Sequence, residues 1–418
     1  MKVDLIIHNC AQVATMASGG KPKTGKDMND AGIIKDAAIA VKDGKIVAID
    51  KTSEIMANHE GGLLVDAEGG IVTPGFVDPH THPVFVHTRE AEFAMRLAGA
   101  TYVEISKAGG GISSTIESTK NADEELLFNL AKKRIKKMIA LGTTTLEAKS
   151  GYGLDTASEL KQLRVIRALD EDLPIDIVPT FMGAHEYPVE YKNDHEAYIE
   201  ILTEDMIPKV AKQGIARYCD IFTEAHVFSI DESRRVLQCA REHGMELKMH
   251  ADEIEPIGGA ELAAELKCAS ADHLGAASEA GLLAMRDAGV TAVLLPATLF
   301  SLRSKSYAKG RFMIDSGLIV AIATDYNPGS CNCDSLPFTM SLACLQMGLN
   351  PVEALCACTI NAAHALGLGA ETGSLEPGKL ADFCIWDIPS LNFIPYHLGS
   401  SYITAVYARG KLVHTSSE

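Results

Sequence analysis

The sequence predicts an α/β protein: a (β/α)8 TIM barrel with a small β-sandwich domain formed from both chain ends. Three observations support this. The 418 residues are too many for one small core and suit a barrel of about 250 residues plus a smaller unit. Apolar strand-like runs alternate with helical stretches through the middle of the chain. Both ends are instead rich in short strands and turns.

The composite domain is expected to take residues 1–72 and 372–418, and the barrel residues 73–371. The turn pair Asp43-Gly44 separates two strand-like runs and indicates a hairpin. The strand-like segments of the two ends are Val3–Ile7, Ala38–Val41, Lys45–Ile49, Gly373–Trp386 and Tyr402–His414.

Eight apolar runs within the barrel region are typical of buried parallel strands. The expected strands are Gly75–His82, Thr143–Lys149, Ile175–Phe181, Tyr218–Thr223, Glu246–His250, Ser270–Leu274, Thr291–Leu295 and Ile319–Asp325. Expected helices include Ser158–Leu169, His195–Gln213, one opened by the capping box Ser229-x-x-Glu232, Gly259–Leu266, Ser278–Ala288 and Leu336–Met347. Eight such units close a barrel, although open doubly wound sheets alternate in the same way.

The formal net charge is −17, which argues against nucleic acid and anionic membranes as partners. It also means that a substrate carrying a carboxylate needs a local cation to receive it. Apolar residues make up 47% and charged residues 22%, as in an ordinary globular protein. No apolar run approaches the roughly 20 residues that span a bilayer.

The ten cysteines are expected to be free thiols in a cytoplasmic protein. Met1–Asn9 alternates polar and apolar residues like a strand and does not resemble a secretory signal. The pairs Cys331-x-Cys333 and Cys356-x-Cys358 lack the C-x₂-C spacing that is usual for structural zinc.

A pair of histidines ends the first expected barrel strand. Residues two apart in a strand point to the same side, so His80 and His82 converge at its carboxyl end, where barrel active sites lie. His250, His273 and Asp325 lie at or near the ends of three later strands and face the same rim. Imidazole and carboxylate groups gathered in this way suit zinc and other first-row metals.

This pattern resembles the amidohydrolase superfamily, as does Gly373–Phe383 (GSLEPGKLADF) after the barrel. The resemblance implies that His80, His82, His250 and Asp325 bind one divalent metal, with zinc expected and iron the alternative. Two-metal members bring a lysine from the fourth strand. Here that strand and the residue after it read YCDIFTE without a lysine, Lys149 lies on the second strand, and Glu224 is interpreted as a polar rim residue.

Further motifs are similar, over essentially the whole chain, to the imidazolonepropionase family. They are Arg89–Ala100, Ala108–Ile112, Lys149–Gly153, Gly183–His185, His250–Glu253 and Thr324–Pro328. The resemblance implies hydrolytic ring opening of 4-imidazolone-5-propanoate to N-formimidoyl-L-glutamate in histidine degradation.

The resemblance also implies roles for single residues. Glu253, His273 and Asp325 are the expected catalytic groups: Asp325 or His273 takes the water proton, and Glu253 carries a proton to the leaving ring nitrogen. Many family members carry glutamine where Glu253 stands. The expected substrate contacts are Arg89, Tyr102, Tyr152, His185, Asn327, Gly329 and Ser330. The Arg89 guanidinium would hold the substrate carboxylate, the alternative being an ordinary pair with Glu90 or Glu92.

Two other functions are compatible with these residues. Another mononuclear amidohydrolase, such as a nucleobase deaminase, could use His250-x-x-Glu253, but a nucleobase has no carboxylate for Arg89. A non-catalytic binding scaffold would not need every ligand and proton carrier that is present. The expected partners are a small-molecule substrate and a second copy in a homodimer.

Overall fold

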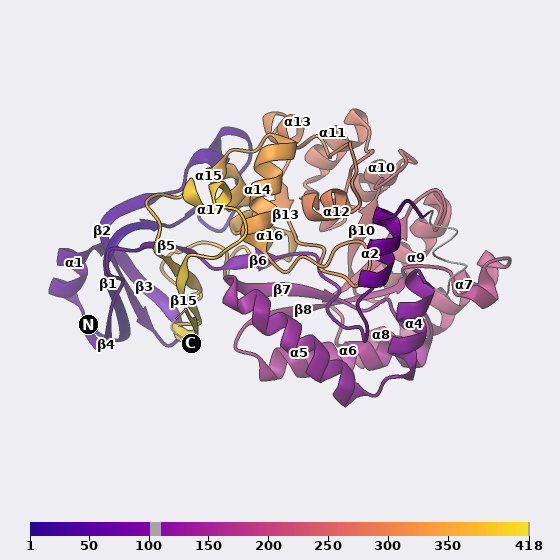
Figure 1. Cartoon of the computed structure of the whole chain (residues 1–418), viewed down its shortest axis with the longest axis horizontal. Coiled ribbons are helices and arrows are strands. Elements are labelled where there is room, and N and C mark those ends of the chain that lie inside the picture. Colours follow the sequence, from indigo (N-terminus) through magenta and orange to yellow (C-terminus); the bar gives the residue numbers. More distant parts are fainter. Residues whose placement is uncertain (101–109, 417–418) are drawn as a thin grey trace.

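The computed structural model describes residues 1–100 and 110–416. A helix-lined barrel forms the larger part of the molecule, and a small β structure that holds both chain ends lies beside it (Figure 1). The predicted fold class is therefore confirmed. Tyr102 lies outside the described residues.

The barrel consists of eight strands paired in chain order, each parallel to the next. They are β6 (Phe76–Asp78), β7 (Thr143–Lys149), β8 (Asp176–Ala184), β9 (Tyr218–Thr223), β10 (Glu246–Ala251), β11 (Ser270–His273), β12 (Thr291–Leu294) and β13 (Val320–Ile322). Beyond the first and last of these strands, the His82 N–H donates to Tyr326 O (2.8 Å) and the Asp325 N–H donates to His80 O (3.1 Å). These two bonds join the ends of β6 and β13 and close the circle.

The first and last barrel strands are shorter than expected. The ladder of β6 ends at Asp78, directly before Pro79, which has no N–H to donate. Asp325 has φ 51°, a left-handed conformation that a strand does not contain. Both segments leave the regular strand pairing before the residues His80, His82 and Asp325, whose side chains turn toward the barrel axis.

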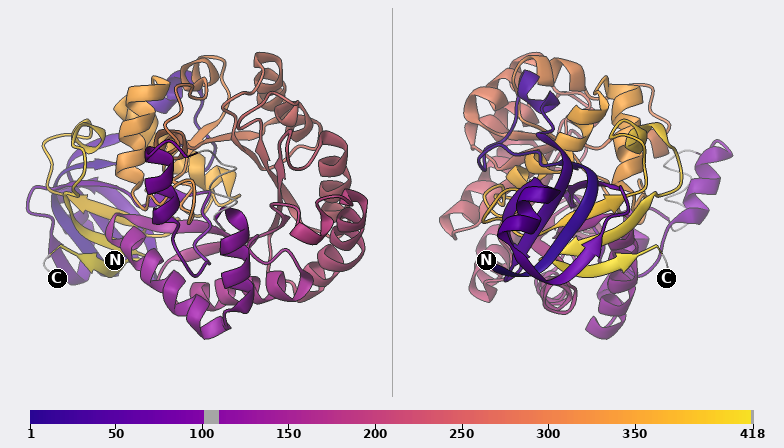
Figure 2. Two further views of the ribbon diagram at one scale, coloured as in Figure 1. Left: turned by 45° about the vertical axis from the view of Figure 1, so that its right-hand side comes forward. Right: turned by 90° about the vertical axis from the view of Figure 1, so that its left-hand side faces the viewer.

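Helices surround the barrel strands (Figure 2). The helices on the rim and between the strands are α2 (Glu90–Leu97), α4 (Ile112–Asn121), α5 (Glu124–Ala140), α6 (Thr156–Asp172), α7 (His195–Glu200), α8 (Ile207–Gln213), α9 (Ile230–Glu242), α10 (Gly259–Glu265), α11 (Glu279–Ala288), α12 (Pro296–Ser301), α13 (Gly310–Asp315), α14 (Leu336–Met347), α15 (Pro351–Ala357) and α16 (Ile360–Ala365). None of the helices in the described part of the chain has the length and apolar character needed to cross a membrane.

Two sequence signals set helix details. Ser229 and Glu232 form the expected capping box at the start of α9. The helix expected over 195–213 is continuous but contains a π-helical turn, η3 (Ile201–Met206), between α7 and α8. Pro208 follows this turn and cannot donate a backbone hydrogen bond, which accounts for the local change of pitch.

The small domain is one mixed sheet built from both chain ends. Its strands are β1 (Lys2–Ala14), β2 (Ile33–Lys42), β3 (Lys45–Lys51), β4 (Glu60–Asp66), β5 (Ile71–Pro74), β14 (Phe383–Trp386), β15 (Ile403–Ala408) and β16 (Lys411–Thr415), accompanied by η1 (Gly25–Asn29), α1 (Thr52–Asn58) and α17 (Phe393–Tyr396). Asp43 and Gly44, with φ 52° and 74°, form the expected hairpin turn. Ile7 and Phe383 belong to one buried core, so the N-terminal and C-terminal parts of the chain pack together in this sheet. The domain boundaries stay a prediction, and β5 straddles the one placed after residue 72.

Trp386 joins the small sheet to the barrel. Its indole N–H donates to Thr73 Oγ1 (2.9 Å), and its ring meets Phe76 edge-on at 5.9 Å between centroids. Trp386 is buried, at 2% exposure, so its side chain contributes apolar burial as well as the hydrogen bond.

We expect Trp386→Ala to lower the free energy of unfolding by about 3–5 kcal/mol, because the cavity left behind adds to the lost burial. Trp386→Phe keeps most of the ring and should cost less. Since Trp386 is the only tryptophan, unfolding in urea is best followed by circular dichroism. Equal stability of the alanine variant and the parent protein would contradict this role.

Candidate active site and metal centre

A cavity of about 530 Å³ opens at the carboxyl ends of the barrel strands, a volume that suits a small-molecule ligand. Ten of the residues expected in the site line it: His82, Arg89, Tyr152, His185, His250, Glu253, His273, Asp325, Asn327 and Ser330. His80 lies beneath them, fully buried, and Gly329 packs against Arg89.

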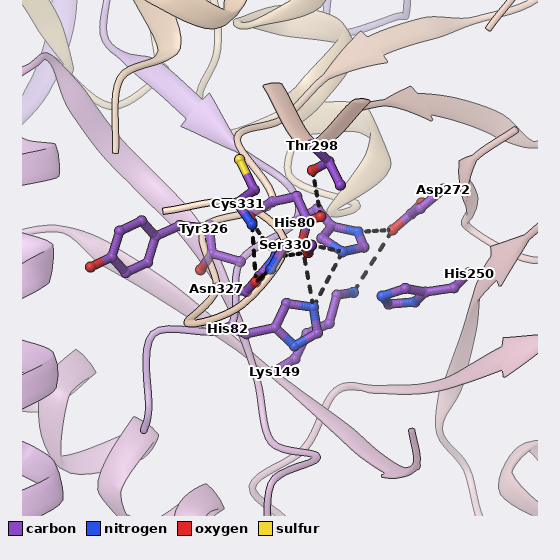
Figure 3. A network of polar contacts seen from close by, with 12 residues as sticks. His80, His82, Lys149, His250, Asp272, Thr298, Tyr326, Asn327, Ser330 and Cys331 are labelled. Atoms are coloured by element: carbon purple, nitrogen blue, oxygen red, sulfur yellow. Dashed lines mark hydrogen bonds and ion pairs between the residues drawn. The ribbon is translucent and has the colours of Figure 1, made fainter. Parts of the chain in front are cut away.

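Three candidate ligands, His80, His82 and Asp325, converge beyond the ends of β6 and β13. Figure 3 shows the two histidine rings close together. The Nε2 atoms of His80 and His82 are 3.3 Å apart. Asp325 Oδ1 lies 3.5 Å from His80 Nε2 and 3.8 Å from His82 Nε2. The other Asp325 oxygen accepts a hydrogen bond from Thr298 Oγ1 (2.6 Å), which fixes the orientation of the carboxylate.

His250 and His273 approach the same centre from β10 and β11. One ring nitrogen from each of His80, His250 and His273 lies within 4.8 Å of the other two. The His80 ring centroid is 4.4 Å from that of His250 and 5.5 Å from that of His273. His273 has φ 74°, so it stands, like Asp325, in a strained backbone conformation of the kind that concentrates at functional sites.

The geometry fits a metal ion. Ligands about 2.1 Å from a tetrahedral ion lie roughly 3.4 Å from each other, and the His80–His82 nitrogens are spaced at 3.3 Å. His80 Nδ1 lies 2.6 Å from Asp272 Oδ2, so the ring proton belongs on Nδ1 and the lone pair on Nε2. Burial lowers the pKa of both histidines well below the usual value, which keeps them neutral and able to bind a metal.

A carboxylate also supports His250. Asp220 Oδ1 lies 3.1 Å from His250 Nδ1 and accepts the backbone N–H of the same residue at 3.2 Å. Burial disfavours a charged His250, but the charge and hydrogen bond of Asp220 outweigh this and raise its pKa. His80 and His250 therefore both direct Nε2 toward the centre, each held through Nδ1 by an aspartate.

Two candidate proton carriers face each other beside this centre. Glu253 Oε2 lies 3.6 Å from His273 Nδ1. Burial raises the pKa of Glu253 to about 7 and lowers the pKa of His273 to about 4. Near neutral pH the imidazole is thus a neutral acceptor, while the carboxyl group holds a proton in much of the population.

Arg89 lines the cavity and also forms the ion pair with Glu92 that the sequence left open as an alternative. Its Nε and Nη2 donate to the two oxygens of Glu92, at 3.0 and 2.9 Å. A Cβ at position 329 would lie 2.3 Å from Arg89 Nη1, so only glycine allows this close approach. Arg96, which sequence reasoning missed although it lies in the quoted Arg89–Ala100 motif, also lines the cavity and donates to Gly329 O (3.3 Å).

The loop that carries Tyr152 is shaped by a buried carboxylate. Glu159 accepts the backbone N–H groups of Gly151 (3.0 Å), Gly153 (2.7 Å) and Leu154 (2.9 Å). His185 Nδ1 donates to Gly151 O (3.0 Å), which leaves Nε2 as an acceptor toward the cavity, and burial lowers the pKa of His185 to about 3.

Asn327 shapes the loop after β13 in the same manner. Its Oδ1 accepts the N–H groups of Gly329 (2.9 Å), Ser330 (2.8 Å) and Cys331 (3.2 Å). Its Nδ2 donates to Asp325 Oδ1 (3.0 Å), so Asn327 also holds a candidate metal ligand.

Sequence reasoning did not identify two other residues as supports of loops. Glu224, interpreted as a rim residue, accepts the N–H groups of Ile254 (2.9 Å) and Glu255 (3.2 Å), next to Glu253. Arg134 donates to the carbonyls of Pro83, Phe85 and Val86 and lies over the Phe85 ring at 3.5 Å. No local pattern distinguishes these residues from solvated charges, because their partners are backbone groups of distant loops.

The sequence also contains a weak signal for the carboxylates and lysines that lie beneath the histidines. Lys149 stands two residues after Glu147, and His250 two residues after Lys248, so each pair points to one side of its strand. Charged residues at this spacing inside an apolar barrel strand indicate an internal ion cluster.

Comparison with known proteins agrees with the fold and the site. A model of the amidohydrolase family matches residues 71–413. The chain belongs to this family.

The particular family follows from close relatives. An imidazolonepropionase from Symbiobacterium thermophilum is 50% identical over 415 residues, covering 98% of this chain and 97% of that protein. One from Alkaliphilus oremlandii is 48% identical over 416 residues, covering 99% and 98%. Within the amidohydrolases, the chain belongs to the imidazolonepropionase family.

More distant structures share the fold alone. An adenosine deaminase from Xanthomonas campestris, solved with bound zinc, has a TM-score of 0.73 at 19% identity, covering 98% of this chain and 93% of that chain. The guanine deaminase of E. coli has a TM-score of 0.74 at 14% identity, covering 98% of each.

We expect Glu159→Ala to lower the free energy of unfolding by about 1–3 kcal/mol, because buried N–H groups lose their acceptor. Glu171→Ala is the matched control, since Glu171 is exposed and pairs only with Arg167 on the same helix. Urea titration of both variants checks this. A larger loss in Glu171→Ala would show that Glu159 does not support the loop.

Proposed function

We propose that this chain hydrolyses 4-imidazolone-5-propanoate to N-formimidoyl-L-glutamate in histidine degradation. Water adds to the ring carbonyl carbon, the cyclic amide C–N bond breaks, and the leaving ring nitrogen takes a proton. The observation that carries the proposal is the convergence of His80, His82 and Asp325 at the base of the cavity, in a chain of the imidazolonepropionase family.

A metal cofactor is supported by the family and by the histidine–aspartate groups. We propose one divalent ion per chain, held by His80, His82, His250 and Asp325. Three nitrogens and one carboxylate oxygen suit zinc first, and iron second. When bound, the ion polarises the carbonyl and lowers the pKa of water toward about 7.

The substrate's propanoate is proposed to lie against the arginine side of the cavity. Glu92 already neutralises one guanidinium, but Arg89 and Arg96 together carry two positive charges, so the pair retains one for the carboxylate. The other proposed contacts are Tyr102, Tyr152, His185, Asn327, Gly329 and Ser330. The free Nε2 of His185 suits a ring N–H, which it can accept.

Proton transfer is assigned to groups that the structure holds close together. Asp325 or His273 takes the proton of the attacking water, since both lie at the centre and His273 is neutral. Glu253, facing His273, delivers a proton to the leaving nitrogen. Its raised pKa suits this task, because a carboxyl group that is already ionised has no proton to give.

Cytoplasmic location and a homodimer also stay proposals. Ten free cysteines fit a reducing compartment. Sedimentation of the purified chain at several concentrations would test the dimer.

The test of the function is turnover of freshly prepared imidazolonepropanoate by the zinc-loaded and the metal-free protein, compared with guanine and cytosine. We expect about one zinc per chain, ring opening only in the loaded protein, and no release of ammonia from either base. Faster turnover of a base would replace the proposal with a deaminase, and binding without turnover would favour a scaffold.

We expect Arg89→Met to lower kcat/KM by roughly tenfold to a thousandfold, because a charge-assisted contact to the carboxylate is lost and Glu92 is left unpaired in the cavity. The double variant Arg89→Met/Glu92→Gln removes the unpaired anion and should recover part of the loss. Arg303→Met is the control, since Arg303 lies outside this cavity. Unchanged steady-state kinetics in Arg89→Met would remove Arg89 from the site.

The raised pKa of Glu253 predicts a pH dependence. The protonated acid exists below its pKa of about 7 and is lost above it, so kcat should fall with rising pH. A bound cation favours the carboxylate and moves this limb to lower pH. Glu253→Gln cannot titrate, so its profile should lack the limb. An identical limb in the glutamine variant would assign the proton to another group.

A further inference from the structure

A cluster of five charged side chains lies inside the barrel, beneath the histidines. Its members are Glu147, Lys149, Asp220, Lys248 and Asp272, and each is 0% exposed. They come from four of five consecutive strands, β7, β9, β10 and β11, and their side chains meet inside the barrel. Three carboxylates face two ammonium groups, so the lysines offset two of the three negative charges and the loss of either lysine leaves a larger uncompensated negative charge.

The two lysines have different partners. Lys149 Nζ lies 2.6 Å from Asp220 Oδ2, 2.7 Å from Glu147 Oε2 and 3.8 Å from Asp272 Oδ2. Lys248 Nζ lies 3.0 Å from Glu147 Oε1, donates to Pro79 O at 2.8 Å and stays 3.9 Å from Asp272. Only Lys149 makes a close ion pair with an aspartate that supports a histidine.

Both aspartates of this cluster also contact a histidine of the proposed metal site. Asp220 holds His250 Nδ1 at 3.1 Å, and Asp272 holds His80 Nδ1 at 2.6 Å. Figure 3 shows the Asp272 carboxylate beside His80, joined by dashed lines to the His80 ring and to the ammonium group of Lys149. A chain of contacts therefore runs from the Lys149 ammonium group through Asp220 to the imidazole of His250, whereas Asp272 lies almost equally far from both lysines.

The two ammonium groups already supply the positive charge that a bound cation would otherwise bring to the carboxylates. One oxygen each of Glu147 and Asp272 lies within 4.8 Å of a His80 nitrogen and of the other, close enough to hold an ion. Lys149 and Lys248 already lie among these carboxylates. Isolated carboxylates here would carry a large desolvation cost and would take up protons or water instead.

We infer that Lys149 is a positioning residue for the metal centre: by its 2.6 Å ion pair with Asp220 it holds that carboxylate in place to direct Nε2 of His250 at the metal. This inference rests on the metal site proposed above. Lys248 balances Glu147 and supports the backbone before His80, and does not hold either aspartate closely.

The test compares Lys149→Met with Lys248→Met, which remove the same charge at the same burial. Zinc affinity is measured by competition with a chromophoric chelator, and the Co²⁺-loaded proteins are compared by visible absorption. We expect Lys149→Met to bind zinc about 10–100-fold more weakly and to show an altered Co²⁺ spectrum, as when the supporting contact of a metal ligand is lost. Lys248→Met should lose less affinity, and Lys149→Arg, which keeps the charge, should recover part of it.

Each outcome is decisive. Parent-like zinc affinity in Lys149→Met, or equal losses in the two methionine variants, would overturn the inference while leaving the metal site intact. Failure of the parent protein to bind zinc or iron would instead remove the proposed function. If Lys149→Met does not fold, Asp220→Asn takes its place, because Lys149 keeps Glu147 as a partner. Unchanged zinc affinity in that variant overturns the inference as well.

Discussion

Charge buried on the barrel axis is the constraint on which the rest of the site depends. Five imidazole and carboxylate groups can gather around one centre only if the charges below them are balanced, because an unpaired charge in this environment costs several kcal/mol. Lys149 on β7 and Lys248 on β10 offset two of the three carboxylate charges from within the barrel wall. Fold and chemistry are thus coupled: the strands that form the barrel wall also neutralise its interior.

The rim is organised by a second recurring contact. Polar side chains at the strand ends or on the following helix accept several backbone N–H groups of one loop. Glu159 does so for the loop of Tyr152, Glu224 for the loop beyond Glu253, and Asn327 for the loop of Ser330. Irregular backbone near a ligand cavity has no ladder partners, so these acceptors take the place of a neighbouring strand. The cavity is thereby shaped before any ligand enters.

Much of the barrel and of the candidate site could be predicted from the sequence, and the predictions that were wrong or missing have physical causes. The bounds expected for the strands at 143–149 and 218–223 match those found, because both segments are rich in the threonine, aromatic and aliphatic residues that favour strands. The first and eighth strands were expected to be too long, since their ligand residues continue the apolar pattern but leave the ladder. Spacing predicted that His80, His82 and Asp325 meet. It did not reveal Asp272 or Arg134, whose partners lie far away in the chain and leave no periodic trace. Arg89 shows the remaining ambiguity, because a guanidinium that lines a cavity and one that pairs with Glu92 look the same in sequence.

The pairing of β5 with β14 has a consequence for how the protein is made. Ile71 finds its sheet partner in Trp386, so the edge of β5 stays unpaired while the whole barrel is being translated. An exposed strand edge of this kind invites association with other chains. β14, which seals this edge, is translated only after the barrel. Synthesis of β14 is therefore also the step that protects this edge of the nascent molecule from aggregation.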